Sequence, residues 1–233
     1  MKAAIITGAS VGIGCATAER FLREGYHVFN LSRRNCPIEG VENIAVDLAD
    51  DSSIAVACES LAQHLARCTT VSLIHNAAQM RKDSTDDCAS DDLRAVLETN
   101  VVAINSLNQA LLTALPRGSS LLYVGSTLSE KAVPGSFSYV VSKHAQLGIM
   151  RATCQDLMGS GVHTALVCPG FTDTEMLRTH LGNDSGVIQA IGAMNSFGRL
   201  IDPDEIAELL FWAHENPVIN GAVLHANLGQ KEA

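Results

Sequence analysis

Tyr139 and Lys143 stand four positions apart in the segment SYVVSKH, which spans residues 138–144. If this segment is helical, residues at i and i+4 lie on one face, so the phenol and the ammonium group are neighbours. A cation beside a phenol favours the phenolate and lowers the pKa of the hydroxyl, as proton transfer by a tyrosine requires. An exposed pair with the same spacing does little, so the spacing alone does not decide between the two interpretations.

A glycine-rich segment, TGASVGIG (7–14), follows an apolar stretch and precedes a helical pattern, which is the context of a nucleotide-binding turn. Glycines there allow a tight turn, a close approach of the backbone to a pyrophosphate, and close packing of helix on strand. The helix N-terminus then presents unpaired N–H groups to the phosphates. No Lys-Ser/Thr pair follows, which disfavours a mononucleotide phosphate loop; the remaining alternative is a turn without a ligand.

Ser32 and Arg33 follow the next apolar stretch, where dinucleotide sites that bind an unphosphorylated ribose carry an acidic residue. An arginine can bind a 2′-phosphate through two hydrogen bonds, whereas a carboxylate would repel it. The sequence therefore favours NADP(H) as the cofactor, with NAD(H) as the second candidate. The alternative is that Arg33 and Arg34 form only a solvated loop.

The composition excludes several classes of function. The 233 residues carry a formal net charge of −9, and a nucleic-acid partner would need clustered Lys and Arg instead. The seven cysteines are odd in number and lack CxxC spacing, and the histidines lack metal-ligand spacing, so neither disulfides nor a metal site are predicted. No apolar run is long enough to cross a membrane and no leader precedes the first strand, so we expect a cytoplasmic protein without membrane contact.

Short apolar runs alternate with longer helical patterns along the chain. The runs expected to form strands span residues 3–7, 27–31, 44–46, 71–75, 120–124, 162–167 and 222–225. The expected helices span residues 12–24, 52–66, 90–115, 138–158 and 203–214. Continuous apolar runs suit strands buried on both faces, and the alternation predicts a doubly wound, parallel α/β sheet with helices on both faces. No linker divides the chain, so residues 1–233 are expected to form a single domain.

The helix expected over 90–115 has the clearest pattern. Ser90 is its expected N-cap, and Asp91 and Asp92 fall in the first turn, where the helix dipole favours negative charge. Asn100 lies within the apolar stripe of this helix, and a buried amide must find hydrogen-bond partners. Asn100 is therefore expected to be either a structural hydrogen-bonding residue or part of a polar site.

Taken in order, these motifs resemble those of the short-chain dehydrogenase/reductase family, particularly the branch similar to 3-oxoacyl-carrier-protein reductases. The resemblance runs from Ala3 to about Gly229, and Ser126 precedes Tyr139 by the family's usual separation. It rests on the segments TGASVGIG (7–14), VDLAD (46–50), HNAA (75–78), ETNVV (98–102), YVGST (123–127) with SYVVSK (138–143), PGFTDT (169–174) and GRLIDPDEIAELLFW (198–212).

The resemblance implies a Rossmann-type, mostly seven-stranded parallel sheet, and an NADPH-dependent oxidoreductase that transfers a hydride between the nicotinamide and a ketone or aldehyde. The residues that it implies for catalysis are Asn100, Ser126, Tyr139 and Lys143. The cofactor contacts expected from the motifs are Gly8, Ser10, Gly12, Ile13, Gly14, Ser32, Arg33, Asp47, Leu48, Asn76, Ala77, Tyr139, Lys143, Pro169, Gly170, Thr172 and Thr174.

Each catalytic residue has an expected role. Tyr139 exchanges the proton, with its pKa lowered by Lys143 and by the positive nicotinamide of the oxidised cofactor. Ser126 donates a hydrogen bond to the carbonyl oxygen and stabilises the charge that develops there. The resemblance further implies that Lys143 binds the nicotinamide ribose, that Asp47 contacts the adenine, and that Asn100 holds a water linking the lysine to a proton path.

Three positions depart from the family pattern, namely Val11, Ala78 and Leu228. Val11 removes a basic residue that many members using NADP(H) carry, and leaves Arg33 as the main support for that cofactor. Two other functions would fit parts of this pattern. One is an NADP(H)-binding regulatory or scaffold protein without turnover. The other, a sugar-nucleotide epimerase or dehydratase, is disfavoured, because those chains have another glycine spacing and a larger C-terminal region.

The segment 176–197 is expected to be the variable substrate lid. Its apolar residues are Met176, Leu177, Leu181, Val187, Ile188, Ile191 and Met194, and its candidate polar contacts are Arg178, His180 and Asp184. This composition suits a medium-sized apolar carbonyl compound, and leaves an acyl thioester, a steroid or a pteridine open. By the resemblance, the faces of 90–115 and 138–158 are expected to contact a second subunit in a homodimer or homotetramer.

Overall fold

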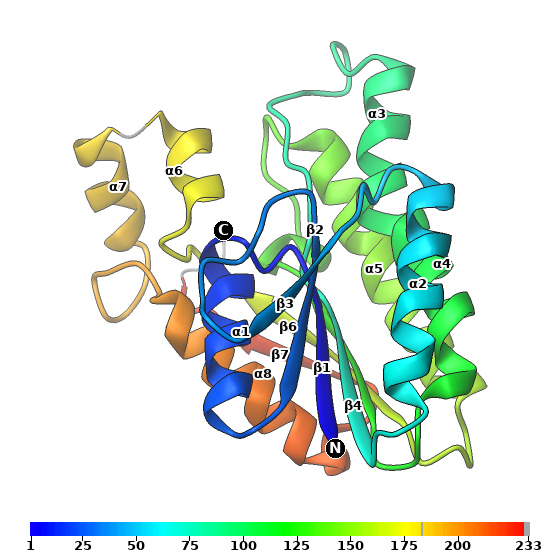
Figure 1. The fold of residues 1–233 in the computed structure, drawn as a ribbon. Coiled ribbons are helices and arrows are strands. Elements are labelled where there is room, and N and C mark those ends of the chain that lie inside the picture. Colours follow the sequence, from blue (N-terminus) through cyan, green and yellow to red (C-terminus); the bar gives the residue numbers. More distant parts are fainter. Residues whose placement is uncertain (183, 231–233) are drawn as a thin grey trace.

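Seven parallel strands form one sheet in the computed structural model, which describes residues 1–182 and 184–230 (Figure 1). The strands lie in the order β3-β2-β1-β4-β5-β6-β7. Their bounds are β1 Lys2–Thr7, β2 His27–Ser32, β3 Val41–Ala45, β4 Thr70–His75, β5 Ser120–Val124, β6 His163–Pro169 and β7 Ala222–Ala226. The order runs outward from the β1–β4 pair in both directions, so the predicted doubly wound fold class is confirmed.

Helices cover both faces of this sheet (Figure 1). One face carries α1 (Gly12–Arg23) and α8 (Pro203–Glu215), while the other carries α2 (Asp51–Leu65), α4 (Ala103–Leu111) and α5 (Phe137–Asp156). The shorter elements are α3 Ser90–Leu97, η1 Glu98–Val102, η2 Leu112–Ala114, η3 Thr127–Ser129, α6 Glu175–Leu181, α7 Ser185–Gly192 and η4 Pro217–Ile219.

Each face of the sheet has its own hydrophobic core. Along β1, Ala3 and Ile5 join one core while Ala4 and Ile6 join the other, because successive strand side chains point to opposite faces. Every residue of β5 and β6 is buried. Burial on both faces explains why these strands appear in the sequence as continuous apolar runs rather than alternating ones.

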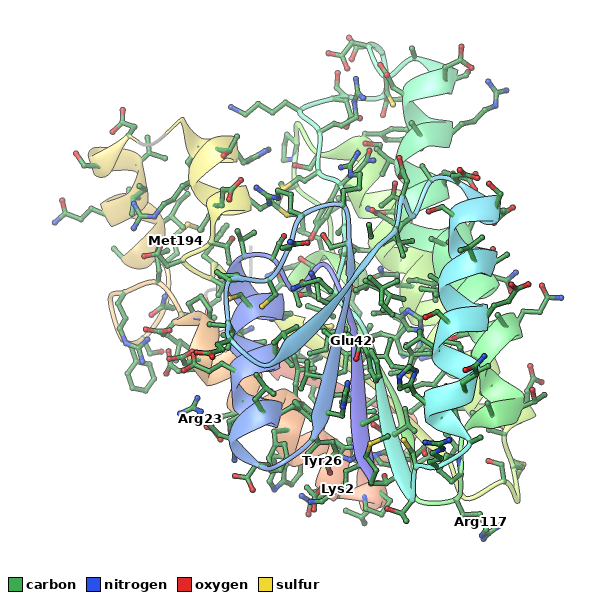
Figure 2. The ribbon with its side chains drawn as sticks, in the orientation of Figure 1. Lys2, Arg23, Tyr26, Glu42, Arg117 and Met194 are labelled. Atoms are coloured by element: carbon green, nitrogen blue, oxygen red, sulfur yellow. The ribbon has the colours of Figure 1, made fainter. Side chains whose placement is uncertain are left out.

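The sheet topology defines where a ligand can bind. In doubly wound folds the crevice lies outside the carboxyl ends of the strands, where the strand order changes direction. Here that point lies between β1 and β4. Lys2 and Tyr26 lie at the opposite edge of the sheet, whereas Met194, just beyond α7, lies at the carboxyl edge (Figure 2).

The helix predicted over 90–115 is interrupted. α3 leads directly into the π-helical turn η1, which is followed by α4, and α4 ends at Leu111. The π turn contains Asn100, which is fully buried. Such a turn inserts a residue into the helical period, and π turns occur frequently at functional sites. Ser90 is not the N-cap as predicted, because Ala89 occupies that position and no side chain caps this helix.

Two further expectations needed correction. The third strand is Val41–Ala45 rather than 44–46, and it lies at the sheet edge, where its side chains are at most half-buried. An edge strand of this kind has no continuous apolar run to mark its start. The helices α6 and α7 were not predicted; both begin with a side-chain cap, from Thr174 and Asp184 respectively.

Candidate active site

A cleft of about 1190 Å³ lies at the carboxyl edge of the sheet. Its walls come from the segments that follow β1 to β6, from the start of α5, and from α6. Of the predicted site residues, those that line it are Gly8, Ser10, Gly12, Ile13, Ser32, Arg33, Asp47, Leu48, Asn76, Ala77, Ser126, Tyr139, Lys143, Pro169, Gly170, Thr172 and Thr174. Gly14 and Asn100 do not line the cleft.

The glycine turn is held by hydrogen bonds from two neighbouring strands. The N–H of Ala9 donates to the Asn30 side-chain oxygen at 2.9 Å. The Asn76 amide donates to the carbonyl oxygens of Thr7 and Gly8 at 3.0 and 3.1 Å. Asn76 therefore supports the turn from behind while also lining the cleft.

The start of α1 fits the phosphates of a dinucleotide. Val11 occupies its N-cap without a side-chain hydrogen bond, and the first turn carries no acidic residue. The first N–H groups are thus available to an anion, and the helix dipole favours negative charge there. Gly14 lies beneath the turn, where a Cβ would be 2.3 Å from the Gly8 carbonyl oxygen.

Replacing Gly14 by alanine should displace the glycine turn. The added Cβ would also lie 2.5 Å from the Asn76 amide nitrogen and 2.9 Å from the Ala9 Cα, so backbone atoms must shift. We expect the free energy of unfolding to fall by about 1–3 kcal/mol and NADPH binding to weaken. Urea unfolding and fluorescence titration with NADPH measure the two effects.

Gly148→Ala is the matched control for this substitution. Gly148 lies in α5, and a Cβ there would meet no heavy atom within 4 Å. Alanine in a helix interior is favoured over glycine by about 0.5–1 kcal/mol, so this variant should be slightly more stable than the parent. If Gly14→Ala were as stable as Gly148→Ala and bound NADPH normally, the close packing of the turn would be contradicted.

The loop after β2 carries the two arginines at the cleft. Both arginines are exposed, and Arg34 pairs with Glu175 at the start of α6, at 3.2 Å. Buried Asn30 donates to the Arg34 carbonyl oxygen at 3.0 Å and to Asn43 at 2.8 Å. Asn30 thus links the glycine turn to the arginine loop. Asn30 was not predicted as a site residue, although a polar residue within an apolar strand pattern is a signal for one.

Ser126, Tyr139 and Lys143 meet in the cleft. Ser126 directly follows the turn at the end of β5, while Tyr139 and Lys143 are one turn apart on α5. The Lys143 Nζ lies 5.4 Å from the centre of the Tyr139 ring. Tyr139 is 8% exposed and Lys143 only 1%, so the ammonium group lies behind the phenol rather than on the surface.

Burial dominates the protonation of both side chains. Burial raises the pKa of Tyr139 to about 12, and a hydrogen bond with Ser126 opposes this shift. Burial also lowers the pKa of Lys143 to about 7. The expected lowering of the Tyr139 pKa by Lys143 is therefore not found in the protein alone, because the effect of burial outweighs that of the Ser126 hydrogen bond.

Asn100 is connected to the cleft through other residues. Its side-chain oxygen accepts from the Gln79 N–H at 2.7 Å, and its amide donates to the Gln79 carbonyl oxygen and to Ser142 Oγ, both at 2.9 Å. Its main-chain oxygen accepts from the Gln146 amide at 3.0 Å. The Gln146 oxygen accepts from the Lys143 Nζ at 3.0 Å, so this side chain connects Asn100 to the lysine. The water expected beside Asn100 stays a prediction.

Asp83 fixes the start of α5, and the sequence analysis did not identify it. The N–H of Ser138 donates to its carboxylate at 3.0 Å, and the N–H of Phe137 donates to its main-chain oxygen at 3.1 Å. Asp83 is 7% exposed. Contacts of this kind between distant segments leave no periodic signal in the sequence.

The expected lid contributes part of the cleft wall. Its apolar residues at the cleft are Met176, Leu177, Leu181 and Met194. Among the candidate polar contacts, only His180 lines the cleft. Arg178 instead makes two hydrogen bonds with Asp173, at 2.6 and 2.7 Å, and Asp184 caps α7. Residue 183 of the expected lid lies outside the described residues.

Three histidines outside the cleft, His75, His163 and His214, are buried. His75 lies 2.8 Å from Asn108, and His214 lies between Ser120 and Tyr26 at 2.8 and 2.9 Å. Burial lowers the pKa of both histidines to about 4. Within residues 1–182 and 184–230, no group of three or more His, Cys, Asp or Glu is arranged to hold a metal ion. In the same ranges, no helix has the length and apolarity needed to cross a membrane.

The sequence matches known proteins over nearly its whole length. A family model described as enoyl-(acyl carrier protein) reductase matches residues 8–231. The chain is 26% identical to 3-oxoacyl-[acyl-carrier-protein] reductase of Salmonella typhimurium, covering 98% of this chain and 96% of that one. It is 27% identical to acetoacetyl-CoA reductase of Shinella zoogloeoides, covering 98% of each.

Solved structures share the fold. A short-chain dehydrogenase from Burkholderia cenocepacia, solved in complex with NADP, superposes with a TM-score of 0.87 at 27% identity, covering 98% of this chain and 97% of that one. Ligand-free aldohexose dehydrogenase from Thermoplasma acidophilum superposes with a TM-score of 0.91 at 23% identity, covering 98% and 93%. The second likeness concerns the fold alone.

Proposed function

The chain belongs to the short-chain dehydrogenase/reductase family, and on that premise we propose that it is an NADP(H)-dependent oxidoreductase. In this proposal it transfers a hydride between the cofactor and a ketone or aldehyde, and the reverse reaction oxidises the alcohol. The observation that carries the proposal is that Ser126, Tyr139 and Lys143 meet in the same cleft as the glycine turn. Family membership alone makes the protein an oxidoreductase; the four expected catalytic positions support turnover.

The protein's own groups would manage the proton and the developing charge. A bound nicotinamide cofactor would supply or accept the hydride. Ser126 would donate a hydrogen bond to the carbonyl oxygen, and Tyr139 would give its proton to that oxygen as negative charge forms. Because the pKa of Tyr139 is about 12, its phenol is protonated before reduction begins. The reverse reaction needs the phenolate, which the positive charge of Lys143 favours.

The proposed preference for NADP(H) depends on Arg33. Arg33 is exposed at the cleft, while the adjacent Arg34 is already paired with Glu175. A guanidinium can bind a phosphate through two parallel hydrogen bonds, and hydrogen bonds to charged groups contribute about 1.5–3 kcal/mol each. The relative from Burkholderia cenocepacia, solved with NADP, supports a nicotinamide cofactor at this site.

Arg33→Ala should therefore weaken NADPH binding by about tenfold or more and leave NADH binding unchanged. Nicotinamide fluorescence during titration with each cofactor measures both affinities. Arg34→Ala is the matched control and should have the smaller effect, because its side chain pairs with Glu175. Equal binding of NADPH and NADH by the parent protein would remove the 2′-phosphate assignment, and failure to bind either would overturn the cofactor site.

The proposed substrate is a medium-sized carbonyl compound with apolar groups. Met176, Leu177, Leu181 and Met194 give one wall of the cleft an apolar surface, and His180 adds a polar group. A first panel of test substrates contains acetoacetyl-CoA, a short aliphatic ketone, an aldehyde and a diketone. Acetoacetyl-CoA is included because one relative is named acetoacetyl-CoA reductase. Turnover of any of these compounds, measured as the loss of NADPH absorbance, supports the reductase. NADPH binding without turnover of the panel would favour the regulatory alternative.

We also propose that residues 1–233 act as a single domain within a homodimer or homotetramer. Val102 of η1 and Val141 of α5 are both 37% exposed, on the two helical segments expected to face a second subunit. A second chain packed against these two segments would cover both side chains.

A further inference from the structure

Gln146 is a fully buried polar side chain at the core of the site, one turn beyond Lys143 on α5. Its oxygen accepts a hydrogen bond from the Lys143 Nζ at 3.0 Å. Its amide nitrogen donates to the main-chain oxygen of Asn100 at 3.0 Å. Only one orientation of the carboxamide satisfies both partners, because an ammonium group cannot accept and a carbonyl cannot donate.

Lys143 is held at two points. Besides Gln146, the Lys143 Nζ donates to the Val124 carbonyl oxygen at 2.7 Å. An ammonium group has three N–H donors, so one remains for groups in the cleft. Val124 ends β5 and Asn100 lies in the π turn, so the sheet and the interrupted helix together determine where the charge sits.

We propose that Gln146 is a positioning residue that fixes the charged form of Lys143 behind Tyr139 by bridging its ammonium group to the main-chain carbonyl of Asn100. The inference rests on the proposed function, in which Lys143 supports proton transfer by Tyr139. The bridge acts by position, because its two hydrogen bonds determine where the ammonium group lies.

Two neutral acceptors, the Gln146 side chain and the Val124 carbonyl, stabilise the charge of Lys143. The titratable groups that act on it are Tyr139 on α5 and Cys168 on β6. Burial raises the pKa of both, so both are neutral in the resting protein. β5 contributes the Val124 carbonyl, and the Asn100 carbonyl of η1 is connected to the lysine through Gln146; neither group titrates. The pKa of Lys143 should therefore change when residue 146 is replaced.

The decisive measurement is the pKa of Lys143 in the full chain without cofactor or substrate, by NMR of lysine side-chain resonances. The Lys143 signal is assigned by its loss in Lys143→Arg. Gln146→Met keeps the length of the side chain and removes both hydrogen bonds, so the pKa should fall below about 7. Gln146→Glu places an anion beside the ammonium group, so the pKa should rise. Each shift should reach about one unit or more.

The matched controls are Gln155→Met and Gln155→Glu, since Gln155 is an exposed glutamine on the same helix. Both should leave the pKa of Lys143 unchanged. Opposite shifts in the two Gln146 variants support the bridge, whereas no shift, or two shifts in the same direction, overturns it. If Gln146→Met does not fold, Gln146→Glu is judged by itself: a raised pKa of Lys143 supports the bridge, and an unchanged or lowered pKa overturns it. Because no turnover is measured, a protein that reduces no carbonyl can still pass or fail this test.

Discussion

Tyr139→Phe is expected to reduce kcat/KM for carbonyl reduction by about 10²–10⁴-fold while NADPH still binds. The substitution removes one hydroxyl and keeps the ring, which is 8% exposed and packed at the cleft wall. Without the phenol, no group beside Ser126 supplies the proton in the proposed mechanism, and general acid catalysis typically contributes a factor of this size. Steady-state kinetics with NADPH and fluorescence titration give the two quantities.

Tyr26→Phe provides the matched control. Tyr26 is also buried, at 3% exposed, but its hydroxyl bonds to Glu215 and His214 at the opposite edge of the sheet from the cleft. Its removal should cost some stability and leave kcat/KM unaltered. A Tyr139→Phe variant with the parent's turnover would place the proton donor elsewhere. A biological activity that survived the change with cofactor bound would favour the regulatory alternative.

The sequence was sufficient to predict the fold, because burial on both faces imposes a visible pattern. β5 and β6 are buried at every position, and each was predicted within two residues of its bounds. The edge strand β3 was displaced in the prediction because exposure removes that pattern. Helices α6 and α7 were missed for a related reason, since short, mostly exposed helices have neither length nor a buried stripe.

Site residues within a recognisable motif could be proposed from the sequence, whereas residues that meet from distant segments could not. In the sequence, Gln146 looks like an ordinary helix residue, yet its side chain makes hydrogen bonds with both Lys143 and the main chain of Asn100. Arg178 looked like a substrate contact, but Asp173, five residues earlier, holds its guanidinium. The π turn at Asn100 changes the helical period without leaving a mark in composition. The degree of burial around Tyr139 and Lys143 was not readable either, and it sets both pKa values.

Lys143→Met should nearly abolish turnover and also change how stability depends on pH. The lysine pKa is about 7 in the folded protein against 10.5 when unperturbed, so between these values the unfolded chain binds more protons. The parent's free energy of unfolding therefore carries a penalty that is complete below about pH 7 and is relieved as the pH rises towards 10.5. Methionine fills the same space without a proton to lose, so this contribution disappears.

Urea unfolding of both proteins at mildly and strongly alkaline pH isolates this contribution, because the other titrating groups are shared. Over two pH units above the folded-state pKa, the parent should gain about 2 kcal/mol relative to the methionine variant. Lys82→Met, which changes an exposed lysine, should follow the parent's pH profile. Parallel profiles for the parent and Lys143→Met would mean that the buried ammonium is not destabilised. In that case the cost of holding a charge behind Tyr139, which the proposed catalysis requires, would not exist.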